Sequence, residues 1–278
     1  MVGTSIVRHP DVDMITFTGS REVGETIAAS AGMIKTVFEL GDNGALLVCE
    51  DADLSQAVKV VMSGAYATAG QSCRGIKRVF VSASIADEFV ELLVEATSTL
   101  KVGNPLDPKT DVGTLIDEQA AQLVEGRVKE AVVDGAHLRY GGIREGALIY
   151  PAVLDHVCQN SQLVRKETFG PIAPVIRFRN FEEAIDSINS SPYGLQTGVL
   201  TSDLSRALYA ARKLRVGAVN INFGPNFDAL NIPFGGVKKS GLGREGAYYA
   251  IREMTTVKTV VLNMAETIRN HSTDGELS

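Results

Sequence analysis

Short apolar runs alternate along this chain with longer amphipathic stretches, and this alternation restricts its fold more than any other feature. Strands buried on both faces appear in a sequence as short apolar runs, and the helices that cross over them appear as amphipathic segments. The sequence therefore predicts an α/β protein in which helices cross over strands. We expect strands over Met14–Thr18, Val37–Glu39, Ala45–Cys49, Arg78–Val81, Val175–Phe178, Thr197–Thr201, Ala218–Asn222 and Thr256–Leu262.

Residues that favour the start of a helix precede two of the amphipathic stretches. Ser20 precedes a helix predicted over Arg21–Ala31, and Asp53 precedes one that runs from Leu54 towards Ala69. Both side chains can accept a hydrogen bond from the first helical turn. Further helices are expected over Ile85–Leu100, Asp117–Val133, Phe181–Ile188, Ser205–Leu214 and Ala247–Met254, with a glycine-rich functional loop over Gly224–Gly246 and a polar tail over Asn263–Ser278.

Composition and charge exclude several classes of protein. The 278 residues are 45% hydrophobic and carry a net charge of −6, which suits a buried core and gives no basic footprint for nucleic acid. The three cysteines, Cys49, Cys73 and Cys158, lack metal-ligand spacing and are predicted to be reduced thiols. No apolar stretch reaches the roughly 18 residues of a membrane span. We therefore expect a cytoplasmic protein without a membrane, nucleic-acid or metal partner.

A cysteine and two glutamates stand in glycine-containing motifs. The motifs are Glu39-Leu40-Gly41, Gly70-Gln71-Ser72-Cys73 and Glu167-Thr168-Phe169-Gly170-Pro171. A thiolate is a strong nucleophile towards a carbonyl carbon, and the thioester it forms can be released by water. A partly buried carboxylate can act as the base for that water. Taken singly, Cys73 also fits a structural thiol and Glu39 a charge at the end of a strand.

In their order along the chain, these motifs resemble those of the aldehyde dehydrogenase superfamily from about Met14 to Leu262. Other matching motifs are Phe17-Thr18-Gly19-Ser20, Glu50-Asp51-Ala52-Asp53-Leu54, Tyr193-Gly194-Leu195, Pro233-Phe234-Gly235-Gly236 and Ser240-Gly241-Leu242-Gly243-Arg244-Glu245-Gly246. The resemblance implies oxidation of an aldehyde to a carboxylic acid with NAD or NADP, through a thiohemiacetal and a thioester. It also implies an aldehyde dehydrogenase-like catalytic domain with an open α/β sheet, plus remnants of a Rossmann-type cofactor domain and an oligomerisation sheet.

The resemblance assigns roles to individual residues. Cys73 corresponds to the nucleophile and Glu39 to the deacylating base. Cofactor contacts are implied for Gly19, Ser20, Leu40, Glu167 and Phe169, with the pyrophosphate at the helix start after Gly19-Ser20, the ribose at Glu167 and the nicotinamide ring beside Phe169. An ordinary strand–helix turn at Gly19-Ser20 and core packing of Phe169 are the alternatives.

Members of the superfamily carry a sizeable portion before the position where this chain begins. That portion supplies most of the cofactor sheet and an asparagine of the oxyanion hole. We therefore expect residues 1–38 to form a partial dinucleotide-binding domain, residues 39–246 the catalytic domain, and residues 247–278 a remnant of the cofactor and oligomerisation region with a polar tail. A homo-oligomer is expected from the family. A non-catalytic fragment that docks on a full-length relative and a cofactor-independent Cys esterase are the alternatives.

Several residues depart from the pattern of the superfamily. Asp42 replaces a glycine, so its carboxylate is expected near the nicotinamide, in a backbone conformation that aspartate tolerates less readily. Arg74, Lys77 and Arg78 could attract an anionic substrate, although a solvated strand edge is the favoured interpretation. Cys73 is expected to be the only fast-reacting thiol.

Overall fold

The centre of the molecule is a seven-stranded sheet with the order β11-β10-β3-β4-β9-β8-β5. The computed structural model describes residues 2–227 and 229–263. Neighbouring strands are parallel, except that β5 runs antiparallel to β8. The predicted α/β architecture is confirmed. The strands are β3 (Ala45–Val48), β4 (Arg78–Ser82), β5 (His137–Tyr140), β8 (Ala152–Asp155), β9 (Ile172–Phe178), β10 (Gln196–Leu200) and β11 (Ala218–Ile221).

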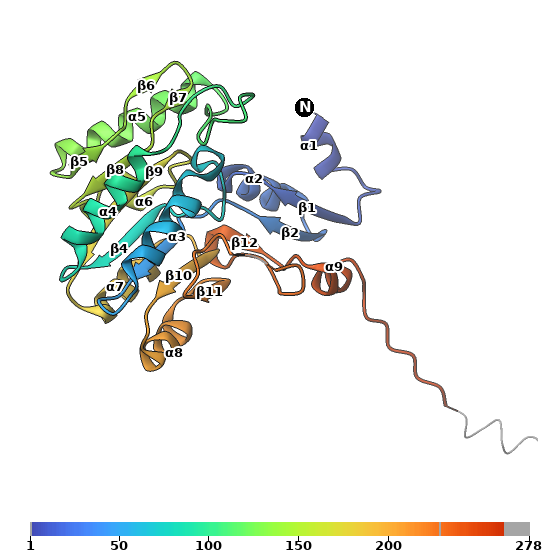
Figure 1. The fold of residues 1–278 in the computed structure, drawn as a ribbon. Helices are drawn as coiled ribbons and strands as arrows, with labels where there is room; N and C mark the ends of the chain where they lie inside the picture. Colours follow the sequence, from blue (N-terminus) through green and yellow to red (C-terminus); the bar gives the residue numbers. More distant parts are fainter. Residues whose placement is uncertain (1, 228, 264–278) are drawn as a thin grey trace, which may run out of the picture.

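Helices cover both faces of this sheet (Figure 1). The chain passes from β3 through α3 to β4 and α4 in one direction along the sheet, and from β9 through α7 to β10, α8 and β11 in the other. Because such crossovers are right-handed, α3 and α4 lie on one face and α7 and α8 on the other. These helices are α3 (Leu54–Tyr66), α4 (Ala86–Ser98), α7 (Phe181–Asn189) and α8 (Leu204–Lys213).

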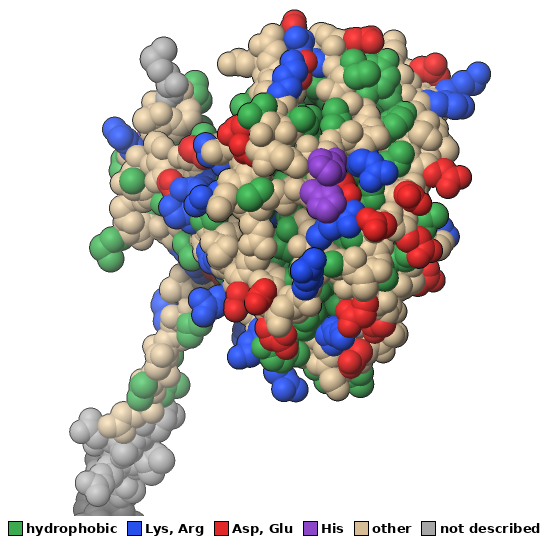
Figure 2. Space-filling model, turned by 90° about the vertical axis from the view of Figure 1, so that its left-hand side faces the viewer, with side chains coloured by type: hydrophobic (Ala, Val, Ile, Leu, Met, Phe, Trp, Pro, Cys, Tyr) green, Lys and Arg blue, Asp and Glu red, His purple; other side chains and the backbone are tan. Residues whose placement is uncertain are grey.

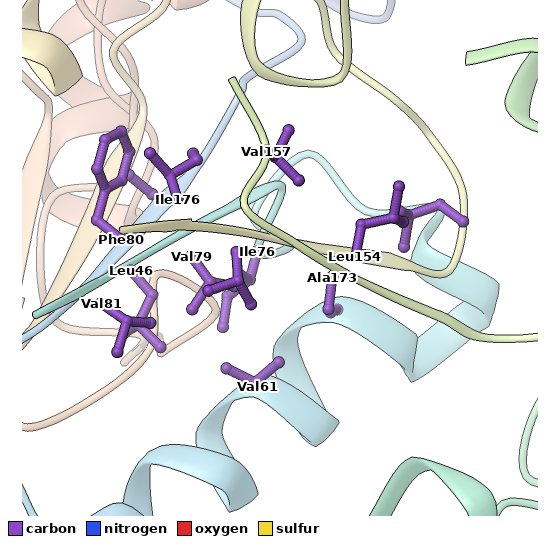
Figure 3. Packing of buried hydrophobic residues seen from close by; sticks show 14 of the residues in the cluster. Leu46, Val61, Ile76, Val79, Phe80, Val81, Leu154, Val157, Ala173 and Ile176 are labelled. Atoms are coloured by element: carbon purple, nitrogen blue, oxygen red, sulfur yellow. The ribbon is translucent and has the colours of Figure 1, made fainter. Parts of the chain in front are cut away.

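The main core lies between the sheet and these helices. Every residue of β3, β4 and β10 is buried, which is typical of parallel strands that are covered on both faces. Figure 3 shows Val61 of α3 facing the side chains of Ile76 and Val79, and all three are at most 1% exposed. This packing fixes the strands that carry the loops described below.

A smaller sheet has the order β1-β2-β12, with β1 (Met14–Thr18), β2 (Lys35–Glu39) and β12 (Gly241–Leu242). Strands β1 and β2 are parallel, and β12 runs antiparallel to β2 with Gly241 opposite Glu39. Helix α2 (Arg21–Ala31) connects β1 to β2. The pairing brings the glycine-rich segment around Gly241 to the end of β2, although this segment follows β2 by more than 200 residues in the sequence.

Several elements differ from the sequence predictions. The predicted strand Thr256–Leu262 is wrong, because these residues form no strand and Val257 is 97% exposed. An extended segment needs a second strand for its hydrogen bonds, and this one leaves the body of the molecule (Figure 1). Helix α3 ends at Tyr66 and not near Ala69, because a 3-10 turn with positive φ at Thr68 and Ala69 follows. Of the predicted polar tail, residues 264–278 lie outside the described residues.

The sequence analysis also missed several short elements. Besides β5, β8 and β12, these are α1 (Val2–Val7), β6 (Arg144–Glu145), β7 (Leu148–Ile149) and α6 (Gln162–Arg165). The remaining predicted helices are present as α5 (Glu118–Val133) and α9 (Ala247–Glu253). No helix within the described part of the chain is long and apolar enough to cross a bilayer. The face in Figure 2 carries acidic and basic side chains interspersed with apolar ones.

Asp51 ties together the carboxyl ends of β3 and β10. Its carboxylate accepts hydrogen bonds from the hydroxyl of Thr201 (2.9 Å), the backbone N–H of Ser202 (2.8 Å) and the backbone N–H of Asp203 (3.0 Å). Burial alone would raise the pKa of Asp51, but the hydrogen bonds from Ser202 and Thr201 lower it to about 2. The charged form therefore stabilises the join between the strands.

We expect Asp51→Asn to lower the free energy of unfolding by about 1–3 kcal/mol at neutral pH, since several donors would lose a charged acceptor. A lowered pKa in the folded state stabilises the protein above the unfolded pKa of about 3.9, and the effect is lost as pH falls towards about 2. The free energies of unfolding of parent and variant, measured with urea, should therefore converge in acid. Glu50→Gln, which removes an exposed partner of Arg206, is the control and should cost under about 1 kcal/mol.

Candidate active site

Four loops meet at the amino ends of adjacent strands. Asp42 precedes β3, Cys73 precedes β4, Glu167 and Phe169 precede β9, and Tyr193 precedes β10. These strands are neighbours in the order β10-β3-β4-β9, so the loops that lead into them lie along one edge of the sheet. Glu39 reaches the same region from the end of β2 in the smaller sheet. The structure thus brings the predicted cysteine and both predicted glutamates together.

Cys73 lies in a turn between η1 (Ala67–Gly70) and β4. Its side chain is half-buried, and Gly75 N–H donates to the Ser72 carbonyl to close the turn (3.1 Å). Gly70 has φ +72°, and a Cβ there would lie 2.1 Å from the Gly170 carbonyl oxygen. Only glycine permits this approach, which packs the Cys73 loop against the loop of Glu167.

Electrostatics around Cys73 do not favour its thiolate. Burial raises the pKa of this thiol, and the carboxylates of Glu167 and Glu39 raise it further, while Arg74 lowers it. The thiol of Cys49 is fully buried, and burial raises its pKa to about 12. Cys158 is exposed. Cys49 therefore fits an inert structural thiol, whereas Cys158 is accessible and can compete with Cys73 in labelling.

Glu39 is a buried carboxyl group without a hydrogen-bond partner. It is 5% exposed, and neither carboxylate oxygen has a partner among the described residues. Burial, together with the charge of Glu245, raises the pKa of Glu39 to about 8 despite the opposing charge of Arg244. A buried polar group without a partner costs stability, so its retention points to a function. Glu39 also lies near enough to Cys73 to influence its pKa.

Glu167 lies against the Glu39-Leu40-Gly41 motif. One of its carboxylate oxygens accepts from Asp42 N–H (3.2 Å), and a Cβ at Gly41 would lie 2.1 Å from the other. Burial raises the pKa of Glu167 to about 7, although Lys77 opposes this shift. Phe169 is 45% exposed, so the alternative of core packing is wrong.

Gly19, Ser20 and Leu40 lie together beside the start of α2. Ser20 caps α2 by accepting a hydrogen bond from Val23 N–H (3.4 Å), as predicted, and Gly19 N–H donates to the Glu39 carbonyl (3.1 Å). Leu40 is buried against Gly24 of the same helix. The first turn of α2 therefore opens next to the end of β2.

Asp42 does not behave as the sequence suggested. Its φ is not positive, and its side chain is 2% exposed. The carboxylate turns into the protein, where it accepts hydrogen bonds from Leu195 N–H (3.1 Å), Gln196 N–H (3.4 Å) and the Ser240 hydroxyl (3.2 Å). The expected strain is wrong. Asp42 instead joins three loops of the site.

The favoured interpretation of Lys77 and Arg78 as a solvated strand edge is also wrong. They are 3% and 4% exposed, respectively. Arg78 Nε donates to the Asn43 carbonyl (2.8 Å), and Lys77 Nζ donates to the Gly70 carbonyl (2.5 Å). Arg74 is half-buried, with its guanidinium carbon 5.8 Å from the centre of the Phe234 ring.

A cavity of about 510 Å³ opens between the start of α2 and Glu167. Four basic side chains line it together with two carboxylates. The basic residues are Arg21, Arg127, Arg165 and Lys166, and the acidic ones are Glu22 and Glu167. Residues 2–227 and 229–263 contain no group of three or more His, Cys, Asp or Glu side chains arranged to hold a metal ion.

Residues 1–260 match the family model described as the aldehyde dehydrogenase family. The chain belongs to this family. It is 46% identical over 263 residues to lactaldehyde dehydrogenase of Methanocaldococcus jannaschii, a match that covers 95% of this chain and 56% of the relative. It is 42% identical over 263 residues to 3-sulfolactaldehyde dehydrogenase of Priestia megaterium, covering 95% and 55%. The chain thus spans about half the length of these relatives.

Solved structures agree with the family assignment. The glyceraldehyde-3-phosphate dehydrogenase of Methanocaldococcus jannaschii, complexed with NADP, has a TM-score of 0.91 and 46% identity, over 94% of this chain and 57% of that chain. The NADP-dependent glyceraldehyde-3-phosphate dehydrogenase of Bacillus halodurans, also complexed with NADP, has a TM-score of 0.92 and 41% identity, over 95% and 56%. The predicted aldehyde dehydrogenase-like fold is therefore confirmed.

The sequence analysis missed two residues that organise this aldehyde dehydrogenase site. Arg127, on α5, donates to the Glu167 carbonyl and to the Thr168 hydroxyl (2.9 Å). Ser240 is fully buried, and its hydroxyl accepts from Gly194 N–H (2.9 Å). Ser240 stood in a matched motif that could have drawn attention to it, whereas Arg127 had no signal in the sequence.

We expect Asp42→Ala to destabilise the protein by about 3 kcal/mol or more, because buried N–H groups would lose their acceptor. Urea unfolding measures the change. Asp134→Ala, at an exposed position after α5, should stay within about 0.5 kcal/mol of the parent. An equally small loss for Asp42→Ala would show that the buried carboxylate does not hold the three loops together.

Iodoacetamide labelling of the folded protein should leave Cys49 unmodified, because this thiol is inaccessible and its pKa is raised. Labelling of Cys73 should increase with pH around a midpoint above the ordinary thiol pKa of about 8.5, since burial disfavours its thiolate. Peptide mass spectrometry would separate this signal from that of exposed Cys158, and Cys73→Ser supplies the blank. A midpoint at or below the ordinary thiol value would contradict the description of the Cys73 environment. Whether Cys73 is the only fast-reacting thiol stays a prediction.

Proposed function

We propose that this chain takes part in the NAD(P)-dependent oxidation of a small aldehyde to a carboxylic acid. The observation that carries the proposal is the buried, unpartnered carboxyl group of Glu39 within electrostatic reach of Cys73. Once a hydride acceptor has oxidised the thiol adduct to a thioester, transfer of the acyl group to water requires a thiol that carries the acyl group and a carboxyl group with a pKa near neutrality. The names of the relatives, which are lactaldehyde, 3-sulfolactaldehyde and glyceraldehyde-3-phosphate dehydrogenases, support a small aldehyde.

The residues of the chain would act in two stages. The Cys73 thiolate adds to the aldehyde carbon and forms a C–S bond, while the carbonyl electron pair moves onto oxygen. After the oxidation, the acyl group is held on Cys73 as a thioester. Ionised Glu39 takes a proton from water, the resulting hydroxide attacks the acyl carbon, and the C–S bond breaks to return the thiolate.

The residues present fit a dinucleotide. A cavity with four basic side chains suits a ligand that carries phosphates, and the capped start of α2 at Gly19-Ser20 opens next to it. The Glu167 carboxylate can accept hydrogen bonds from a ribose diol, and half-exposed Phe169 offers an apolar face to a ring. Leu40, next to the end of β2, would support the surface that Glu167 and Phe169 offer to the cofactor. When bound, NAD or NADP supplies the hydride acceptor of the oxidation.

Further features of the proposal follow from the family and the chain together. We assign residues 1–38 to the cofactor domain, residues 39–246 to the catalytic domain and residues 247–278 to a remnant region with a polar tail. A homo-oligomer is supported by the exposed apolar side chains of the segment Thr256–Leu262, of which Val257, Val260, Val261 and Leu262 are all at least 70% exposed. A cytoplasmic location is supported by the absence of cysteine pairs that would form a disulfide framework.

A second candidate is cofactor-independent ester hydrolysis, because this chain itself supplies both Cys73 and Glu39. Acylation of the thiol by an activated ester and release by water need no hydride acceptor. The same chemistry also provides a test of the Glu39 role that does not depend on NAD or NADP.

We expect Glu39→Gln to keep acylation of Cys73 by p-nitrophenyl acetate but to slow deacylation by about two to four decades. Because the pKa of Glu39 is about 8, deacylation in the parent should rise with pH and level off above that value, and the variant should lack this rise. Intact-mass measurement of the acetylated protein follows both steps. The comparison is made in a Cys158→Ser background, since Cys158 is exposed.

Glu25→Gln is the matched control, because Glu25 is an exposed carboxylate on α2 that pairs with Arg21 and Lys239. Its deacylation rate should equal that of the parent. Equal rates in Glu39→Gln and the parent would make Glu39 a structural residue at the end of β2. No acylation in any variant would favour a non-catalytic chain that docks on a full-length relative.

A further inference from the structure

Lys77 is a buried cation that the proposed mechanism does not use. The residue lies between Cys73 and β4, and it is 3% exposed. Lysine is almost never fully buried unless its ammonium is paired. The burial of Lys77 beside a reactive thiol therefore requires an explanation from its surroundings.

The loop of Cys73 is wrapped around this ammonium. Lys77 Nζ donates a hydrogen bond to the Gly70 carbonyl at one end of the loop (2.5 Å). At the other end, a Cβ on Gly75 would lie 3.0 Å from Nζ. The same ammonium lies 4.8 Å from the centre of the Phe169 ring, a cation–π distance. One charged group thus contacts both ends of the nucleophile loop and the segment of Phe169.

Three acidic groups from different loops act on Lys77. The carboxylates of Glu167 and Asp42 and the thiolate of Cys73 each favour its charged form, whereas burial disfavours it. Burial is the largest effect, and it lowers the pKa of Lys77 to about 8. The charge of Lys77 in turn is the largest effect that lowers the pKa of Glu167, against the raising effect of burial. The ammonium is therefore charged at neutral pH and loses its proton just above it.

We propose that Lys77 is a positioning residue for the thiol chemistry proposed above: its buried ammonium holds the Cys73 loop against the segment of Glu167 and Phe169 and places a positive charge beside the thiol. The inference rests on the proposed role of Cys73 as nucleophile. It explains why a lysine occupies a position that is only 3% exposed, and why a glycine at 75 leaves room for it.

The test compares Lys77→Met and Lys77→Arg in a Glu39→Gln background, which removes a carboxyl group whose pKa is also about 8. Iodoacetamide labelling of Cys73 is measured by peptide mass spectrometry against pH, as a ratio to labelling of Cys158 in the same molecules. Because one neighbouring charge shifts a pKa by about one unit or more, Lys77→Met should lower the Cys73 ratio about tenfold below pH 8. Lys77→Arg, which keeps the charge, should retain the ratio.

Above the pKa of Lys77, the Cys73 labelling ratio of the parent should approach that of Lys77→Met, since both proteins then lack the charge. The ratio of Lys77→Arg should stay higher. Lys129→Met removes an exposed lysine on α5 and should change nothing. Deuterium exchange of residues 67–76 should increase in Lys77→Met and not in Lys129→Met.

Equal Cys73 ratios in parent and Lys77→Met below pH 8 would overturn the proposal. If Lys77→Met does not fold, Lys77→Gln is used in its place, because glutamine keeps a hydrogen-bond donor for the Gly70 carbonyl but carries no charge. If neither folds, the comparison of parent with Lys77→Arg decides, and identical profiles through pH 8 overturn the proposal. None of these measurements needs acyl turnover, so failure of Glu39 as a base would not be mistaken for failure of Lys77.

Discussion

The site depends on a buried network between Asp42 and Ser240. The Ser240 hydroxyl lies 2.9 Å from the Gly41 carbonyl and 3.2 Å from the Asp42 carboxylate, and it accepts from Gly194 N–H. Leu40 N–H donates to the Ser240 carbonyl (2.9 Å). Segments near residues 40, 195 and 240 are thereby joined inside the protein, where an unsatisfied group would be costly. This junction also connects the smaller sheet, which carries Glu39, to the larger sheet, which carries Cys73.

Burial sets the chemistry of the groups that this junction brings together. It raises the pKa values of Glu39 and Glu167 to about 8 and about 7 and lowers that of Lys77 to about 8, so three groups titrate within a narrow range. Ordinary carboxylates and amines titrate several units apart. Because these values converge near neutrality, a proton could pass between the groups at little cost in free energy, as the proposed thioester chemistry would require.

Much of the fold could be predicted from the sequence because its signals are local. The apolar runs of β3, β4 and β10 and the capping residues Ser20 and Asp53 each act within a few neighbours, and all were placed correctly to within about the usual uncertainty of element ends. Strand β5 was missed because it lies at the edge of the sheet with most of its residues exposed, and the short strand β8 was missed because its burial depends on its neighbours in the fold. The strand predicted over Thr256–Leu262 has a suitable pattern but no partner among the described residues.

The sequence by itself determined the family and the α/β class, and it singled out Cys73, Glu39 and Glu167 as candidate site residues, because these residues lie in motifs whose order along the chain matches the family. Only the tertiary structure decided where those residues meet. The loops gather at the amino ends of the strands, and Asp42, Lys77 and Arg127 acquire their roles from contacts with segments 35 or more residues away, or from burial that no local pattern reveals. The physical reason is that desolvation and long-range hydrogen bonding depend on which segments pack together, and packing is a property of the whole fold.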